Sequence, residues 1–281
     1  TSFYAQNYEK NWNKLIKNEN NGKIKSANAI VAKIHKKAVA DKNEVQIIKC
    51  FFYESKYLQV VDENAQTKII NNLKAEINRA SIPSKAILNL VYAKCLSDYY
   101  DDNDYIVRSR TNTVSLDDDF LTWTNTDFIN QIDTSFQNTL KDETILKSTS
   151  LSQYEELFDF FTLEKFNKQN LFDYLLGENI DYYTQKIEQW GINKSKFIVF
   201  EKELIGKSAD FIQLNFDFTK DENLKKALVL YQKQEMNAST LENQFDRMQF
   251  CDTYLLNSND TFMKSLNLLQ KESKDIILTQ K

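Results

Sequence analysis

Glycine and proline are so scarce in this chain that few folds remain open to it. The 281 residues include 4 glycines and 1 proline, whereas an average globular chain carries about 7% glycine and about 5% proline. Folds with many tight turns depend on both residues, so long helices joined by short connections are expected. We therefore predict an all-α protein in which helix exceeds roughly 60% of the residues, well above the usual third.

The composition is typical of a folded chain with an ordinary surface. Hydrophobic residues make up 42% of the sequence and aromatic residues 13%, which is enough apolar surface for one large core or two adjoining cores. The 36 basic and 40 acidic residues are interspersed and give a net charge of −4, so no strong field favours a nucleic acid or an anionic membrane. No apolar run reaches the length of a transmembrane segment, and none is expected.

Helical periodicity recurs along residues 7–100, which we predict to form an N-terminal helical-hairpin array. One apolar stripe ends at Ile16, and after Gly22 a second stripe runs from Ala27 to Ala38. The pair resembles a tetratricopeptide (TPR) hairpin, in which a bulky residue such as Trp12 packs on small residues of the next helix. Because no 34-residue repeat recurs, we predict an irregular array of antiparallel, TPR-like hairpins.

The helical period disappears near residue 101 and returns near residue 126, which leaves a long connector at 101–125. Such a segment inside a compact domain is usually functional or ordered by its own contacts. We expect a buried guanidinium–carboxylate set to pin it, since arginine forms planar bidentate pairs with carboxylates. In this prediction Trp123 is buried against the preceding helices, and Arg110 pairs with a carboxylate or with carbonyls at a helix C-terminus. An anion site built from the same groups is the alternative. The residues concerned are Arg108, Arg110, Asp118, Asp119 and Trp123.

A second helical part, residues 126–281, is predicted to pack on the first. Apolar residues return at helical spacing after residue 126, and the pattern weakens after Gly191. Within this weaker region, Lys196–Phe200 is predicted to be a short strand or an extended segment.

Few residues of the chain suggest chemistry. His35 is the only histidine, so a catalytic triad or a typical zinc site lacks partners, and its place beside an apolar stripe indicates a structural or surface role. Cys50, Cys95 and Cys251 lie far apart without metal-ligand spacing and are interpreted as small buried hydrophobes. The acidic run Asp101–Asp104 fails the calcium-loop pattern, and solvated carboxylates at a helix end are expected. We predict no catalytic, cofactor-binding or metal-binding residue.

Several short blocks follow one another in a fixed order after an opening Tyr8–Trp12. They are Ile82–Leu88, Asp98–Tyr100, Arg110–Thr111, Asp118–Trp123 and Asn170–Leu175. In this order the blocks resemble the N-terminal helical region of the very large alpha-2-macroglobulin-like proteins of Bacteroidota. The resemblance covers most of the chain, from Tyr8 to about Leu269.

The resemblance implies an exported protein, periplasmic or associated with the outer membrane, with further domains C-terminal to Lys281. Residues 1–6 are then interpreted as a signal-peptide remnant. Many members of the wider family capture a protease through a thioester, whose cysteine is closely followed by Glu-Gln. None of the three cysteines here has that context.

The resemblance therefore implies a non-enzymatic scaffold or docking domain at the N-terminus of a protease inhibitor of envelope defence. Such a domain has protein partners, no cofactor and no nucleic acid. The alternative is a free-standing helical-repeat adaptor of the cell envelope that binds a peptide or an outer-membrane protein. A hydrolase that uses the connector carboxylates is a third, least favoured hypothesis.

Overall fold

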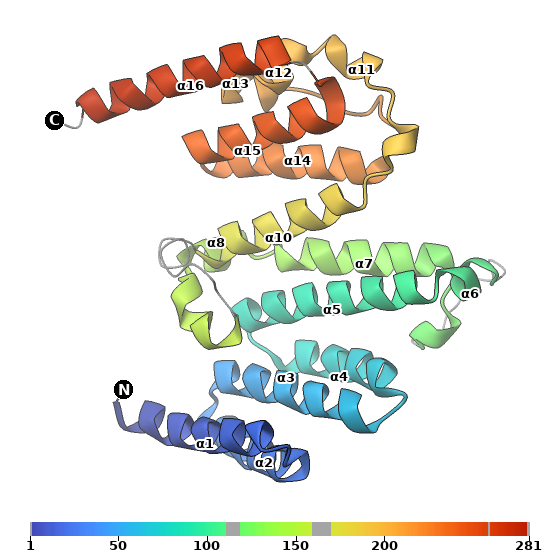
Figure 1. Ribbon diagram of the computed structural model, residues 1–281, viewed down its shortest axis with the longest axis vertical. Helices are drawn as coiled ribbons and strands as arrows, with labels where there is room; N and C mark the ends of the chain where they lie inside the picture. Colours follow the sequence, from blue (N-terminus) through green and yellow to red (C-terminus); the bar gives the residue numbers. More distant parts are fainter. Residues whose placement is uncertain (1, 111–118, 159–169, 258, 280–281) are drawn as a thin grey trace. The chain divides into compact units, whose positions relative to one another are not determined.

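The chain is helical throughout the part that the structure describes. A computed structural model describes residues 2–110, 119–158, 170–257 and 259–279. Of the residues that the structure describes, about 80% are helical, and they form no β-strand beyond one isolated antiparallel bridge between Ser150 and Asn170. The all-α prediction is confirmed, and the helices form an array in which neighbours in the sequence pack together (Figure 1). No described helix is both long enough and apolar enough to cross a membrane.

The chain divides into two compact units, Thr1–Leu175 and Leu176–Lys281. The division falls inside a helix near residue 175, whereas the sequence suggested a change of part at residue 126. The difference arises because α7 packs along α5 within the first unit. The first unit contains α1 (Ser2–Asn20), α2 (Ile24–Asp41), α3 (Glu44–Val61), α4 (Ala65–Arg79), α5 (Ile82–Asp102), α6 (Asp104–Arg108), η1 (Phe120–Thr122), α7 (Asn125–Thr139), α8 (Glu143–Ser148), η2 (Leu151–Leu157) and the start of α10 (Leu171–Gln185).

The first two helices form the expected hairpin. Gly22 adopts a left-handed φ of 69° in the turn between them, a conformation that glycine reaches without steric cost. Trp12 is buried against the α2 stripe, and its indole Nε1 donates a hydrogen bond to Gln46 Oε1 at 2.6 Å. The helix α1 begins at Ser2, so residues 2–6 belong to it. A TPR-like geometry of these hairpins stays a prediction.

The predicted loss of helix at residue 101 is wrong for the first residues of the connector. Helix α5 continues to Asp102, and α6 follows it at once. The Tyr99 ring lies 5.8 Å from that of Phe128 in α7 and 5.0 Å from that of Phe120. The last turns of α5 are thus completed by aromatic partners from far along the chain, which a local period cannot reveal. Residues 111–118 lie outside the described residues.

The second unit is built from long helices and single helical turns. Lys196–Phe200, predicted as a strand or extended segment, instead contains a helical turn, α11. The rings of Phe197 and Phe200 both pack on Phe218, so tertiary contacts hold a turn too short to show a period. The unit contains the rest of α10, η3 (Gln189–Gly191), α11 (Ser195–Ile198), α12 (Glu201–Leu204), α13 (Ser208–Phe211), α14 (Glu222–Asn237), α15 (Leu241–Cys251), a π-helical turn η4 (Asp252–Leu256) and α16 (Asn259–Thr279).

Candidate protein-binding groove

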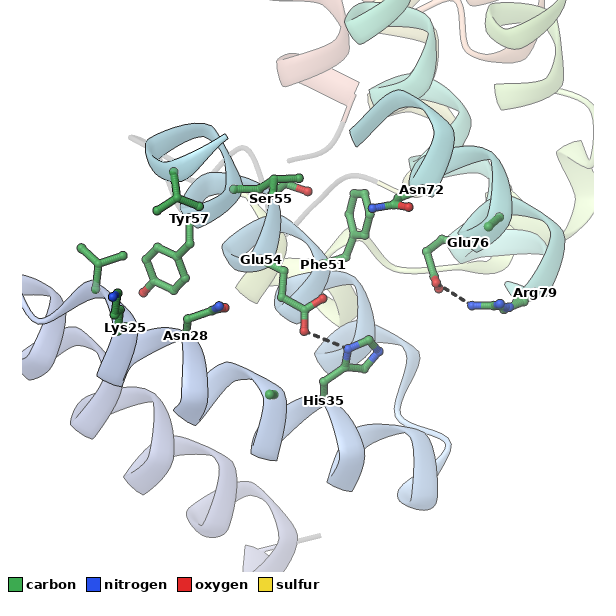
Figure 2. Close-up of a pocket in the computed structure, with 15 residues that line it drawn as sticks. Lys25, Asn28, His35, Phe51, Glu54, Ser55, Tyr57, Asn72, Glu76 and Arg79 are labelled. Atoms are coloured by element: carbon green, nitrogen blue, oxygen red, sulfur yellow. Dashed lines mark hydrogen bonds and ion pairs between the residues drawn. The ribbon is translucent and has the colours of Figure 1, made fainter. Parts of the chain in front are cut away.

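The first unit carries a groove of about 700 Å³ over α2, α3 and α4, shown in Figure 2. Connections of two or three residues join these helices, and such short links make sequential helices antiparallel neighbours. We call this cavity the groove. It is lined by Ile24, Lys25, Asn28, Ala32 and His35 of α2, by Phe51, Glu54, Ser55, Tyr57, Leu58 and Val61 of α3, and by Asn72, Ala75, Glu76 and Arg79 of α4.

The groove forms because two neighbouring faces of α2 have different roles: one is buried in the core and the other lines the cavity. The stripe from Ala27 to Ala38 is buried in the core that α2 shares with α1. The groove residues of α2 recur at i, i+3, i+7 and i+10, which places them together on one neighbouring face. Ala32 on this wall and Ala75 on the α4 wall are small and exposed, so neither side chain fills the space between the helices.

The middle of the groove holds the only histidine of the chain. His35 Nδ1 lies 3.0 Å from Glu54 Oε1, and both side chains are partly exposed. A histidine–carboxylate pair can support a nucleophile only when the nucleophile is hydrogen-bonded to the imidazole. Ser55 also lines the groove, but no hydrogen bond joins it to His35 among the described residues. The arrangement is a histidine–carboxylate contact between α2 and α3 without a paired nucleophile.

The two ends of the groove differ in charge. At one end, Arg79 Nη1 donates to Glu76 Oε1 at 3.0 Å, so cation and anion offset one another there. At the other end Lys25 lies beside Tyr57, as Figure 2 shows. Within the described part of the chain Lys25 has no ion pair or hydrogen bond. The Lys25 end therefore carries a cation that the groove itself does not neutralise.

The Tyr57 hydroxyl is a buried polar group without a partner. The side chain is 2% exposed, and its oxygen makes no hydrogen bond in the structure. Burial raises the pKa of Tyr57 to about 12, with smaller contributions from the charges of Glu19 and Tyr53, so the phenol is neutral at pH 7. In Figure 2 the hydroxyl points toward Lys25 and Asn28 on the groove wall. Buried hydroxyls nearly always have a partner, which makes this one notable.

The connector residues do not form the expected buried ion-pair set among the described residues. Arg108 pairs with Asp104 of its own helix, and both side chains are substantially exposed. Arg110 Nη1 donates to the Trp123 carbonyl oxygen at 2.6 Å, and Trp123 caps the C-terminus of η1, so the second of the two partners predicted for Arg110 is the one found. The Asp119 side chain accepts from the Leu121 amide and caps η1. Asp118 lies outside the described residues.

Trp123 itself occupies a small aromatic cluster. Its side chain is 7% exposed, and its ring packs edge-on against Phe120 and Phe128. Arg110 therefore links the end of α6 to this cluster through a backbone carbonyl. Trp123 lies at the C-terminus of η1, and carbonyls at a helix end have no acceptor role within the helix, so this one can accept from Arg110.

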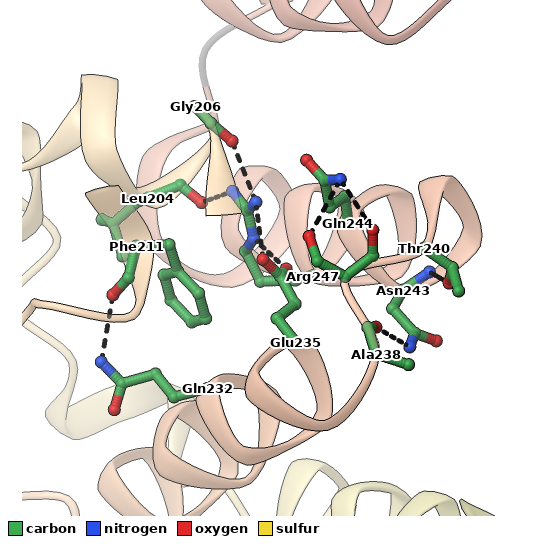
Figure 3. Close-up of polar contacts among 11 residues, drawn as sticks. Leu204, Gly206, Phe211, Gln232, Glu235, Ala238, Thr240, Asn243, Gln244 and Arg247 are labelled. Atoms are coloured by element: carbon green, nitrogen blue, oxygen red, sulfur yellow. Dashed lines mark hydrogen bonds and ion pairs between the residues drawn. The ribbon is translucent and has the colours of Figure 1, made fainter. Parts of the chain in front are cut away.

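A fully buried guanidinium–carboxylate pair does exist, in the second unit, and sequence reasoning missed it. Arg247 Nε donates to Glu235 Oε1 at 2.8 Å, and both side chains are 0% exposed (Figure 3). Arg247 also donates to the carbonyls of Leu204 and Gly206, and its guanidinium lies 4.7 Å from the Phe211 ring centre. Nearly every polar group of the pair is satisfied, so it fixes the loop after α12 against α14 and α15.

A sequence signal for this pair was present. Arg247 falls at helical spacing among the buried residues of α15, next to Met248 and one turn before Cys251. An arginine on an apolar stripe requires a buried acceptor. The acceptor, Glu235, could not be assigned because other carboxylates, Glu242, Asp246 and Asp252, lie nearer to Arg247 in the sequence.

The cysteines match their interpretation as buried thiols only in part. Cys50 and Cys251 are buried, Cys95 is partly exposed, and all three are free. Burial raises the pKa of Cys50 and Cys251 to about 12 and that of Cys95 to about 11. None is therefore a thiolate at neutral pH.

No cluster of three or more His, Cys, Asp or Glu side chains suited to a metal ion occurs in the described ranges.

Comparisons with models of protein families, with curated proteins and with solved structures gave no match to this chain.

Proposed function

We propose that this chain is a non-enzymatic, protein-binding scaffold domain and that its groove receives a segment of a partner protein. The observation that carries the proposal is an open cavity of about 700 Å³ whose exposed lining residues Lys25, Asn28 and Asn72 make no hydrogen bond or ion pair among the described residues. An occupant can contact these groups without breaking a bond within the protein, so the groove is suited to being filled.

Binding rather than catalysis is supported by the chemistry of the groove. His35 is paired with Glu54, and the groove places no hydrogen-bonded nucleophile beside it. The lining combines apolar side chains with two amides and with Lys25, His35, Glu54, Glu76 and Arg79, and a few polar groups on an apolar surface fix the orientation of a bound ligand.

The resemblance to alpha-2-macroglobulin-like proteins of Bacteroidota supplies a setting for this activity. In that setting the domain is the exported, N-terminal docking part of an envelope protease inhibitor, and the chemistry of protease capture belongs to domains after Lys281. The partner segment then comes from a downstream domain or from another envelope protein. The alternative setting is a free-standing envelope adaptor, and the length of the native reading frame separates the two.

The experiment that tests the proposal blocks the groove without disturbing the core. Ala32→Trp places a large ring in the cavity from an exposed position of α2, and Lys33→Trp adds the same ring one residue further along the helix, outside the lining. A display library of short random segments is panned against the full chain and both variants. We expect segments that bind the parent chain and Lys33→Trp but not Ala32→Trp. Equal binding to Ala32→Trp overturns the groove as the site.

A further inference from the structure

We infer that the occupant of the groove is an extended internal protein segment in which an acidic side chain lies next to an apolar one, with the carboxylate at Lys25. This inference rests on the proposed function and specifies its partner. It is carried by the distribution of charge, apolar surface and free amides along the groove.

Charge sets the direction of the occupant. Of the two glutamates of the groove, Glu76 is paired with Arg79, and Glu54 Oε1 lies 3.0 Å from His35 Nδ1. Lys25 has no anionic partner within the described residues. An anionic group on the occupant is therefore attracted to the Lys25 end. The segment is bound in one direction, since reversal takes its carboxylate away from Lys25 to the end where Arg79 already pairs with Glu76.

Apolar surface surrounds the lone cation. Ile24, Leu58 and Val61 line the groove at the same end as Lys25, because the start of α2 lies beside the end of α3. Val61 is 71% exposed, and burying such a side chain stabilises a complex by about 25 cal/mol per Å² of apolar area. An apolar side chain adjacent to the carboxylate fits this surface. The exposure of Val61 also shows that this end is open, so a chain can continue past it, and the segment is internal.

Free amides favour an extended backbone. Asn28 on the α2 wall and Asn72 on the α4 wall both line the groove and are exposed. Neither makes a hydrogen bond to any described residue. Each carboxamide offers donors and an acceptor, which match the N–H and C=O groups of a peptide. Those groups are free in an extended segment and already bonded within a helix, so an extended segment is selected.

The test uses two display libraries of short random segments panned against the full chain. In one library each random segment is flanked by fixed spacers on both sides. In the other library each segment ends in a free carboxyl terminus. We expect the internal library to enrich aspartate or glutamate next to a leucine, isoleucine, valine or phenylalanine. A labelled peptide of the enriched sequence, and the same peptide with its acid replaced by the amide, are then titrated by fluorescence anisotropy.

Lys25→Glu is the diagnostic variant, and Lys33→Glu is its control with the same charge change on an exposed position outside the groove. Reversal of the charge that faces the carboxylate is expected to weaken the affinity for the acidic peptide about tenfold and to leave the affinity for the amide peptide unchanged. Lys33→Glu leaves both peptides unchanged.

The outcomes separate this inference from the proposed function. If Lys25→Glu keeps full affinity for acidic segments while Ala32→Trp abolishes it, the groove is the site but the acidic occupant is wrong. Enrichment only from the library with free carboxyl termini overturns the internal segment. Undiminished binding by Ala32→Trp overturns both the inference and the proposed function.

Discussion

Removing one oxygen atom from Tyr57 is expected to make the free protein more stable. The Tyr57 hydroxyl is buried without a hydrogen-bond partner, so Tyr57→Phe deletes a desolvated polar group and loses no bond. An unsatisfied buried group costs about 1–3 kcal/mol, and recovery of part of that cost raises the free energy of unfolding by about 1 kcal/mol. The ring keeps its packing against Tyr53, with centroids 6.2 Å apart.

Tyr8→Phe is the matched control in the same unit. Tyr8 is equally buried, but its hydroxyl donates to Asp41 Oδ2 at 2.7 Å. The same deletion there removes a hydrogen bond to a carboxylate, which destabilises the protein by about 1–2 kcal/mol. One chemical change therefore has opposite expected signs at two positions, and the only difference is the presence of an acceptor.

Calorimetry and urea denaturation of the full chain measure both effects. For a unit of this size, about 1 kcal/mol corresponds to roughly 2–4 °C in Tm. The Tm of Tyr57→Phe is therefore expected to rise, and that of Tyr8→Phe to fall, by at least that amount. A Tm for Tyr57→Phe that drops as far as that of Tyr8→Phe refutes the reasoning. The Tyr57 hydroxyl is then already satisfied in the free protein.

Four further predictions concern other parts of the chain. Glu235→Ala leaves the Arg247 guanidinium buried without its anion and is expected to cost the second unit about 3–5 kcal/mol, whereas Glu235→Leu with Arg247→Met restores most of it; urea midpoints check both. Arg110→Ala loses the bond to the Trp123 carbonyl and is expected to lower the free energy of unfolding by about 1–2 kcal/mol. Arg108→Ala, at an exposed pair, is expected to change the free energy of unfolding by less than about 0.5 kcal/mol, and urea denaturation measures both. Burial alone raises the pKa of Glu156, but hydrogen bonds from Lys49 and Gln46 outweigh it and lower this pKa below its usual 4.5. Glu156 thus stabilises the fold above about pH 4.5 and loses this contribution as the pH falls through its folded pKa, so the stability of Glu156→Gln depends less on pH in acid titrations. Incubation with proteases is expected to yield slow cleavage near Gly22 and no covalent adduct on a denaturing gel, and an adduct contradicts a binding role.

The helical class of this protein could be predicted from composition and period alone. Scarce glycine and proline exclude a fold of many tight turns, and the apolar stripe from Ala27 to Ala38 is buried as its spacing requires. These are local properties, because the 3.6-residue repeat places a stripe on one face of a helix whatever else the chain does. The same holds for the turn at Gly22, whose positive φ is a property of the residue.

The predictions failed where a partner comes from far along the chain. The end of α5 is completed by Phe120 and Phe128, and the helical turn at Ser195–Ile198 is held by Phe218. Neither segment has a period of its own long enough to be recognised. Local pattern therefore underestimated helix in both places, because tertiary packing supplies the stabilisation that a short helix lacks.

The groove and the buried ion pair were decided by the tertiary structure alone. In the sequence Lys25, Asn28 and Asn72 are indistinguishable from solvated residues of a helix surface, and nothing local states that Tyr57 lacks an acceptor. A concave site exists only when faces of three helices are brought together around small residues. Likewise Glu235 becomes the partner of Arg247 only when α14 and α15 pack. Periodicity determines which face of a helix is buried. Which residue of another helix packs against that face depends on tertiary contacts that no single helix encodes.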